Sequence, residues 1–409
     1  MGTNRRDFVK KFSALGLISA TYPFLNSFQG STELDYLNEK IDKIELFRYD
    51  IDIPRYFSWG TWYNRQHLFM KISSGNYYGW SEIPASVNTP DLDPSEWVKY
   101  VRSYNGLTVG QAQKLLFSQQ VPENKANTKQ LEFMEMGLLD LSGRMQSKPA
   151  IELLNLNHRN PVPGLFCILD KDVEKVRKEA LKSIEQNLSH HLKFKMYGER
   201  ELDTQLLRTI REVLGENAVV ISDVNKGYKN WNTLNELASI MVDFRDNGLN
   251  AIEDPADLKT DEWIQLQQMI GELSLIPDAP MRPAWEGLKK IDPGMGRIFN
   301  LHPSTMGSFR YTAQMANKIK EIGAEVMIGD DSLVGPACSA WQQIAIGTGA
   351  SWVEAIEKKE DSKNYLNCLI SSPTKKDTNG YYSLEPTPGF GIELDTKRMM
   401  KTCKLYIEA

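Results

Sequence analysis

From about residue 160 onward, the chain alternates short strand-like runs with longer helix-like stretches. The runs begin about 22 to 31 residues apart, a period typical of βαβ units around a parallel sheet. Eight runs favour a closed β/α barrel over an open doubly wound sheet, and no glycine-rich loop follows the first run to support dinucleotide binding. The eight runs are residues 164–169, 191–196, 218–223, 249–253, 275–278, 297–301, 325–328 and 351–355.

The first 150 residues have a different pattern. Residues 44–53 largely alternate apolar and polar side chains, which predicts a strand. Residues 67–72 and 77–81 predict two more strands, joined as a hairpin by a turn at 74–76. Residues 91–147 are mainly helical in pattern. The sequence therefore predicts a small α+β domain before the barrel.

The N-terminus predicts export. Arg5 and Arg6 precede Phe8 and an uncharged run at 12–25, which is too short for an ordinary membrane span. The paired arginine resembles a twin-arginine signal, which exports folded proteins, so we expect a periplasmic mature protein. The alternative is an amphipathic N-terminal helix. No later apolar run is long enough to predict a membrane span in the mature form.

Charge and cysteine content exclude several classes of partner. The 48 Lys and Arg residues are outnumbered by 53 Asp and Glu residues, for a formal net charge of −5. No long basic stretch stands out beyond the N-terminus, which argues against nucleic acid as a partner. The 4 cysteines form no CxxC pair, which gives no support to a zinc or redox site.

Charged residues gather at the ends of the predicted barrel strands. In a β/α barrel these C-terminal ends converge on one mouth. The second strand ends in Lys193 and Lys195, whose two-residue spacing puts both on one face. Asp223, Glu253 and Asp278 end the next three strands, and three carboxylates without His or Cys suit Mg²⁺ better than zinc.

With these residues in place, the sequence resembles the enolase superfamily, in particular its muconate-lactonizing and mandelate-racemase branches. The resemblance covers nearly all of residues 40–400. It is carried by the strand-end residues and by the segments 136–143, 223–225, 253–255 and 388–394. It implies a (β/α)₇β barrel beneath an N-terminal α+β capping domain that the C-terminal tail completes.

The domain organisation follows from the two patterns and the resemblance. We expect an export signal and linker at 1–34, the capping domain at 35–157, the barrel at 158–374 and a tail packing on the capping domain at 375–409.

The resemblance also implies roles at the mouth. Asp223, Glu253 and Asp278 bind Mg²⁺, and Lys195 is an acid/base with Lys193 beside it. Mg²⁺ on a substrate carboxylate stabilises the enediolate formed when the α-proton leaves. We expect the pKa of the lysine to fall because a metal ion and a second ammonium group lie near it.

Two strand ends depart from the family pattern. His302 stands where the muconate-lactonizing branch has a second catalytic lysine, and Asp330 and Asp331 follow the seventh strand where the racemase branch has a histidine. We therefore expect a swapped dyad, with His302 as the second acid/base and Asp331 or Asp330 orienting it. The alternative is that His302 only caps a strand before Pro303.

Substrate contacts are predicted in two places. Trp59 and Tyr63 lie in the aromatic segment 54–66, where the family has a loop that closes the site. Asn225 and Glu354 end barrel strands and face the same mouth. The substrate is expected to be a small-molecule carboxylate, and the enzyme a homo-oligomer.

Three functions remain open from the sequence. A racemase or epimerase, of an amino acid or dipeptide-like acid, needs an acid/base on each face of the α-carbon. A dehydratase of a sugar acid or hydroxy acid needs one group to take the proton and another to assist the leaving hydroxyl; a cycloisomerase is a variant of this case. The third is an exported binding protein that has lost catalysis.

Overall fold

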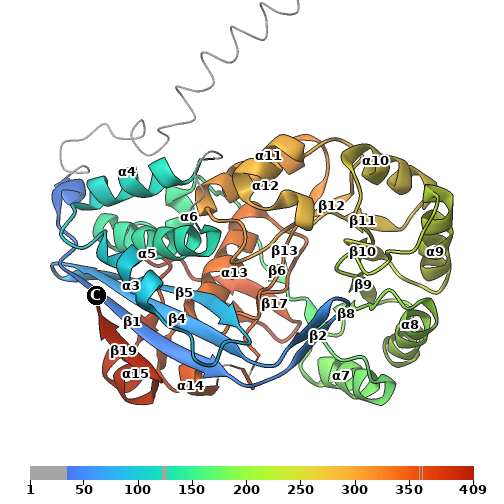
Figure 1. Ribbon diagram of the computed structural model, residues 1–409, viewed down its shortest axis with the longest axis horizontal. Helices are drawn as coiled ribbons and strands as arrows, with labels where there is room; N and C mark the ends of the chain where they lie inside the picture. The colour runs from blue at the N-terminus through green and yellow to red at the C-terminus, as the bar shows by residue number, and fades with distance from the viewer. Residues whose placement is uncertain (1–34, 122–126, 359, 362) are drawn as a thin grey trace, which may run out of the picture.

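The computed structural model describes residues 35–121, 127–358, 360–361 and 363–409. Figure 1 shows two adjoining parts, a capping domain with a sheet and helices on the left and a barrel with outer helices on the right. The predicted export signal lies outside the described residues. No helix among these residues is both long and apolar enough to cross a membrane.

The capping domain is built on an antiparallel sheet of order β19-β1-β4-β5. Its strands are β1 (Lys43–Ile51), β4 (Arg65–Ser74), β5 (Tyr77–Val87) and β19 (Leu405–Glu408). The predicted hairpin is β4–β5. Three helices, α3 (Ser95–Arg102), α4 (Val109–Gln119) and α5 (Thr128–Gln146), follow it. Gly79 allows α5 to approach the sheet closely, since a Cβ there would lie 2.2 Å from the carbonyl oxygen of Gly137.

Eight parallel strands form the barrel, as the sequence predicts. They are β7 (Phe166–Ile168), β8 (His191–Lys195), β9 (Val219–Asp223), β10 (Ala251–Glu253), β11 (Ser274–Ile276), β12 (Ile298–Leu301), β13 (Glu325–Ile328) and β14 (Trp352–Val353). Asn300 N donates to Pro277 O at 3.1 Å and links β12 to β11, while Leu165 N donates to Val353 O at 2.8 Å and closes the ring.

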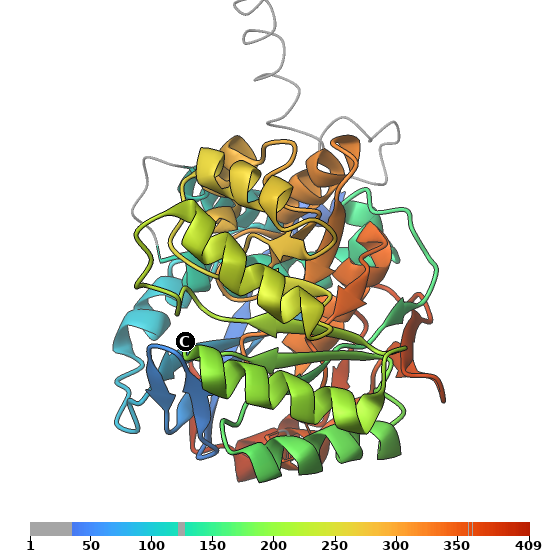
Figure 2. The ribbon, with the colours of Figure 1, turned by 90° about the vertical axis from the view of Figure 1, so that its right-hand side faces the viewer.

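A helix follows each of the first seven barrel strands and packs outside them, which gives the predicted (β/α)₇β architecture. Figure 2 shows several of these helices lying across the outer face. They are α7 (Val173–Glu185), α8 (Arg200–Leu214), α9 (Leu234–Asp246), α10 (Thr260–Met269), α11 (Ala284–Lys290), α12 (Phe309–Glu321) and α13 (Pro336–Thr348).

The chain after β14 contacts both parts. In it, β17 (Tyr381–Leu384) pairs with β16 (Thr374–Lys376) and with β6 (Val162–Pro163) just before the barrel. The last strand, β19, pairs with β1 and completes the cap sheet. The remaining short elements are η1 (Asp35–Asn38), β2 (Arg55–Phe57), β3 (Gly60–Trp62), α6 (Ala150–Leu153), η2 (Ala279–Met281), α14 (Lys363–Leu366), β15 (Leu369–Ser371), β18 (Glu393–Leu394) and α15 (Thr396–Thr402).

A buried carboxylate on α5 ties the sheet to the tail. Asp140 accepts hydrogen bonds from the backbone N–H of Trp80 at 2.7 Å and of Phe390 at 2.7 Å, and Arg144 Nε lies 3.2 Å away. Burial raises the pKa of this carboxyl. A buried carboxylate destabilises the folded state unless hydrogen-bond donors and a counter-charge satisfy its oxygens.

We therefore expect Asp140→Ala to lower the free energy of unfolding by about 3–5 kcal/mol, since it removes the acceptor of three backbone amides, that of Gly391 at 3.3 Å included, and one of the partners of Arg144. Urea denaturation measures this. The control Asp257→Ala removes a carboxylate that is 86% exposed and paired only with Lys226 among the contacts found, and it should change stability by less than about 0.5 kcal/mol. Equal effects of the two variants would contradict the structural role.

Candidate active site

The barrel interior is closed below its mouth by a layer of apolar side chains. This layer consists of Leu165, Ile221, Ala251, Ile276, Ile298, Met327 and Trp352. Because side chains alternate along a strand, the residue two positions further on shares the same face and lies nearer the C-terminal end. That step places Asp223, Glu253 and Glu354 at the mouth.

Two lysines and three carboxylates form one buried cluster at this mouth. Lys193 Nζ lies 2.7 Å from Glu253 Oε2, 2.8 Å from Glu354 Oε2 and 3.6 Å from Asp223 Oδ2. Lys195 Nζ donates to Asp223 Oδ2. The cluster follows from strand order, since β8, β9 and β10 are neighbours and Lys195, Asp223 and Glu253 are in register. The structure thus brings together Lys193, Lys195, Asp223 and Glu253 of the predicted group, and their roles in catalysis and metal binding stay predictions.

The pKa of neither lysine is depressed here. Burial lowers the pKa of Lys195, but Asp223 and other charges reverse it, and the net direction is upward. The pKa of Lys193 lies well above its ordinary value, since Glu253 and Glu354 outweigh burial. For these side chains by themselves, attraction to the carboxylates exceeds repulsion between the ammonium groups. The predicted fall in pKa depends on a bound metal ion as well and stays a prediction.

Asp278 lies apart from this cluster, in an ion pair with Arg282. Arg282 Nε donates to Asp278 Oδ1 at 2.7 Å. The neighbouring Asp254 accepts from the backbone N–H of Asp278 at 3.1 Å and of Ala279 at 3.0 Å. Within the part of the chain that the structure describes, no three His, Cys, Asp or Glu side chains are gathered closely enough to hold a metal ion as they stand.

The charge at the mouth nevertheless fits a divalent cation. Five carboxyl groups accompany three cationic side chains there, a formal excess of two carboxylates when all are ionised. The groups are Asp223, Glu253, Asp254, Asp278 and Glu354 against Lys193, Lys195 and Arg282. Burial, then Glu253, raises the pKa of Asp254 to about 7. Glu253 Oε2 has no hydrogen bond of good geometry, although Lys193 lies near it. Oxygen donors of this kind suit Mg²⁺.

His302 follows β12, but the predicted dyad is wrong. Asp331 pairs with Lys129 at 3.4 Å, and Asp330 pairs with Lys358 at 2.6 Å. The described contacts of the imidazole are instead with its own loop: Nδ1 lies 2.9 Å from Pro303 O and 3.4 Å from Thr305 Oγ1. Asp331 and Asp330 are therefore paired with lysines, Lys129 on α5 and Lys358 after β14, and not with the imidazole.

The contacts of the imidazole indicate its tautomer. Burial, then the charges of Arg282 and Lys193, holds the pKa of His302 well below its ordinary value. A carbonyl only accepts hydrogen bonds, so Nδ1 carries the proton that is donated to Pro303 O. The lone pair is therefore on Nε2, and His302 is chemically a base.

The aromatic segment forms the hairpin β2–β3, and the side chain nearest the lysines is Phe57. Its ring lies 5.2 Å from Lys195 Nζ. Trp59 stacks on Phe57 but is 54% exposed, and Tyr63 is 65% exposed. In this arrangement the expectation that Trp59 and Tyr63 line the site is therefore not met. Phe57 and Arg55 share one face of the strand, whereas Trp59 lies in the turn and Tyr63 lies beyond β3.

The other two predicted substrate residues brace the lysines. Asn225 Oδ1 accepts from Lys195 Nζ at 3.2 Å, while its backbone N–H donates to Asp223 Oδ1 at 2.8 Å. Glu354 accepts from Lys193 Nζ at 2.8 Å. Both lie at the mouth as the sequence predicts, and their contact with substrate stays a prediction.

Three residues at or near the mouth were not singled out from sequence. Arg282 lies in the turn after β11, Phe57 lies within an aromatic run, and Asn300 Nδ2 donates to Glu253 Oε1 at 2.8 Å. The sequence pattern could have identified Asn300, because it lies two residues after Ile298 of the interior layer. The same two-residue spacing places Asp223, Glu253 and Glu354 at the mouth. Arg282 carries no comparable pattern.

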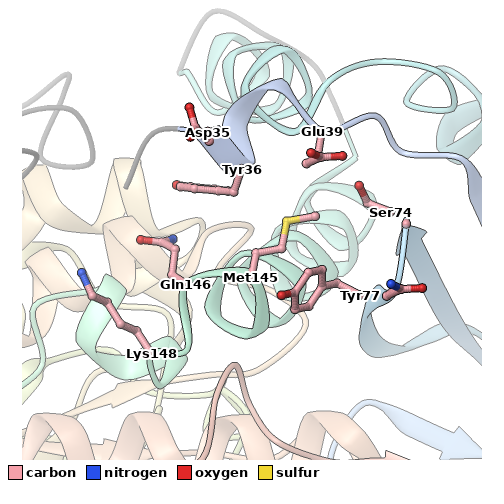
Figure 3. A pocket seen from close by; sticks show the side chains of 10 residues that line it. Asp35, Tyr36, Glu39, Ser74, Tyr77, Met145, Gln146 and Lys148 are labelled. Carbon is pink, nitrogen blue, oxygen red and sulfur yellow. The ribbon is translucent and has the colours of Figure 1, made fainter. Parts of the chain in front are cut away.

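A cavity of about 510 Å³ lies elsewhere, at the outer edge of the cap (Figure 3). Tyr36 and Met145 line it from η1 and from the end of α5, and Tyr77 lines it from the start of β5. None of the residues predicted for catalysis or metal binding borders this cavity. It is therefore separate from the candidate site.

Comparison with known sequences identifies a family and several relatives. The family described as "Enolase C-terminal domain-like" matches residues 175–398. Muconate cycloisomerase 1 of Acinetobacter baylyi is 25% identical over 273 residues, which are 65% of this chain and 70% of that protein. L-Lys-D/L-Arg epimerase of Methylococcus capsulatus is 26% identical over 215 residues, which are 52% of this chain and 59% of that protein.

The fold also has a counterpart among solved structures. A dipeptide epimerase from Cytophaga hutchinsonii, complexed with Mg and the dipeptide D-Ala-L-Val, matches with a TM-score of 0.74 at 15% identity. The match covers 90% of this chain and 99% of that one. At such low identity the likeness establishes the fold, a barrel with an N-terminal cap.

Proposed function

Because the chain belongs to the enolase superfamily, we propose that it is a Mg²⁺-dependent racemase or epimerase. In this proposal it removes the proton next to the carboxylate of an amino acid or a dipeptide-like acid and returns a proton to the opposite face. The epimerase among its relatives, which is named for L-Lys-D/L-Arg, supports this reaction and this class of substrate.

The observation that carries the proposal is the placement of two proton-transfer groups. Lys195 ends the second barrel strand, β8, and His302 follows the sixth, β12. In a ring of eight strands the second and the sixth are opposite each other, so the two groups approach a substrate in the mouth from opposite sides. A racemase requires one acid/base on each face of the α-carbon.

The chain's own residues then divide the work. Lys195 exchanges a proton on one face, and Nε2 of His302 exchanges a proton on the other. Lys193, held between Glu253 and Glu354, presents an ammonium group to the substrate carboxylate. Phe57 covers Lys195 from the hairpin and excludes water from it.

Mg²⁺ is assigned to Asp223, Glu253 and Asp278. When bound, it supplies positive charge that stabilises the negative charge developing on the substrate carboxylate. The formal excess of two carboxylates supports this assignment. To bind Mg²⁺, the carboxylate of Asp278 has to give up its ion pair with Arg282. The guanidinium of Arg282 is then available to bind an anionic group of the substrate.

Export to the periplasm is part of the proposal and rests on Arg5 and Arg6. Replacing both with lysine is expected to retain the protein in the cytoplasm, because the twin-arginine route depends on that pair. Fractionation of expressing cells measures this. Unchanged export of the double variant would contradict the twin-arginine assignment.

The reaction is tested on a panel of acids in D₂O with Mg²⁺. The panel holds the separate L and D forms of arginine, lysine and N-succinylarginine, together with alanyl-valine dipeptides, arabinonate and muconate. Deuterium at the α-carbon together with inversion, seen by NMR and chiral chromatography, is the expected result for an amino acid or dipeptide.

The other outcomes separate the alternatives. A 2-keto product from arabinonate would replace the proposal with a dehydratase, and a lactone from muconate would replace it with a cycloisomerase. Tight binding of a carboxylate without any exchange would favour a binding protein that has lost catalysis.

A further inference from the structure

The loop after β12, which carries His302, is held by two buried carboxylates of the capping helix α5. Glu132 accepts hydrogen bonds from the backbone N–H of Ser304 at 2.6 Å and of Gly307 at 3.1 Å. One turn further on, Glu135 accepts from the N–H groups of residues 309 and 310, at 3.1 Å and 3.0 Å. Both carboxylates are almost fully buried. A helix of the cap therefore fixes a loop of the barrel.

One of these contacts reaches the imidazole of His302. The Ser304 N–H and the Pro303 carbonyl belong to the same planar peptide unit and point in opposite directions. Glu132 holds the N–H side at 2.6 Å, and His302 Nδ1 donates to the carbonyl side at 2.9 Å. The three groups form a continuous chain from carboxylate to peptide to imidazole.

We propose that Glu132 is the positioning residue of His302 and acts on it through the Pro303–Ser304 peptide unit. It takes the role that the sequence assigned to Asp331. The inference rests on the proposed function, in which His302 is the second acid/base, but the hydrogen-bond chain itself is testable without substrate.

The physical effect of the chain has two parts. A carboxylate on the N–H side polarises the peptide unit and makes its carbonyl a stronger acceptor. The stronger acceptor keeps the proton on Nδ1 of His302 and leaves the lone pair on Nε2. Glu132 also fixes the loop in place, because Ser304 has φ +64°, a left-handed conformation that a side chain rarely adopts without support.

The second oxygen of Glu132 prevents the carboxylate from turning away. It accepts from Gly307 N–H, where a side chain would clash with the ring of Trp285 at 2.9 Å. Burial raises the pKa of Glu132 to about 8, while the two amides lower it. The tests below are therefore run above that pH, where the wild-type carboxylate is ionised.

Glu132→Gln is the variant that tests the proposal, and Glu135→Gln is its matched control. Both changes lie on the same buried face of α5; Glu132→Gln weakens two amides of the loop, and Glu135→Gln weakens the first two amides of α12. Only Glu132 contacts the peptide unit that binds His302 Nδ1. A role limited to stability predicts the same behaviour for both variants.

The first measurement uses ¹⁵N-histidine labelling of the full protein with Mg²⁺ alone. The chain has 5 histidines, so the side-chain nitrogen signals can be assigned by substitution. The wild type should show His302 with its proton on Nδ1. Glu132→Gln should shift His302 toward the other tautomer, while Glu135→Gln should leave it unchanged.

The second measurement follows α-hydrogen exchange in D₂O from the D and L forms of each amino acid in the panel. Glu132→Gln should slow exchange on the His302 face by about tenfold to a hundredfold, the cost of misplacing a catalytic group by a fraction of an ångström to one ångström. The Lys195 face should change by less than about threefold, within the effect of a remote substitution. His302→Asn identifies which face belongs to His302.

Several results would overturn the inference. In the wild type, a proton on Nε2 of His302 would do so, and this measurement needs no variant that might fail to fold. Equal slowing of both faces by Glu132→Gln would assign it a purely structural role, as would a His302 signal that does not change. If the wild type exchanges neither face while the tautomer shift occurs, the proposed function fails and the positioning contact stands.

Discussion

Lys195→Ala is expected to lower the rate of α-hydrogen exchange on one face of the substrate by about 10²–10⁴, the usual contribution of a general acid/base. The reason is its position: Nζ lies against Asp223 and beneath Phe57, with Asn225 Oδ1 at 3.2 Å as a further brace. Exchange on the other face, assigned to His302, should persist. Exchange in D₂O from separate D and L substrates measures the two faces independently.

The control is Lys226→Ala, which removes an exposed ammonium group whose partner is Asp257 at 2.7 Å. It should leave both rates within about twofold of the wild type, because exposed ion pairs contribute little. Retention of both exchange rates in Lys195→Ala would contradict its assignment as an acid/base. Loss of both rates, with the protein folded, would point to a role in binding instead.

Glu253→Gln is expected to abolish activity on both faces and to weaken Mg²⁺ binding. Loss of a contact that only supports a metal ligand lowers affinity by about 10–100-fold, and loss of a ligand itself should lower it further. Glu253 lies at the centre of the cluster, 2.7 Å from Lys193 Nζ and hydrogen-bonded to Asn300 Nδ2 at 2.8 Å. The amide keeps the size of the side chain but removes one carboxylate from the formal excess at the mouth. Calorimetric titration with Mg²⁺ alone measures the affinity.

Its control is Glu216→Gln, an exposed carboxylate between α8 and β9, which precedes the start of β9 and so lies at the end of that strand opposite the mouth. This variant should bind Mg²⁺ as the wild type does. If Glu253→Gln also bound Mg²⁺ with wild-type affinity, the metal assignment would be wrong, whatever happened to the activity.

The barrel and its charged mouth were predictable because both follow from local periods. Strand-like runs recur about every 22 to 31 residues, and within a strand the face repeats every second residue. Ile221 in the interior therefore implies Asp223 at the mouth, and Ala251 implies Glu253. No knowledge of distant contacts was needed for these residues.

The partners of His302 were not predictable, because they depend on contacts between distant segments. Asp331 is taken by Lys129, which lies 202 residues away on α5. Glu132, 172 residues from Ser304, is the carboxylate that reaches the loop of His302 through a backbone amide. A backbone contact leaves no residue-type pattern in the sequence, so only the folded cap reveals it.

The lining of the site was also only partly predictable. The aromatic segment marked the right hairpin, but which ring faces Lys195 depends on where β2 ends and its turn begins. Asp278 was correctly placed after β11, yet its contact with Arg282 depends on the turn that follows. Strand ends are set by local pattern, and the loops beyond them are set by packing.

We propose above all that this protein uses Mg²⁺ to remove a proton next to a carboxylate. The most direct measurement is α-hydrogen exchange by the wild type in D₂O over the panel of acids, with Mg²⁺ and again after its removal by a chelator. With Mg²⁺ we expect deuterium to exchange into the α-position of at least one acid. This exchange should stop when a chelator removes Mg²⁺ and should resume when Mg²⁺ is restored. Exchange that continues at the same rate without the metal, or binding of an acid without exchange under either condition, would contradict it.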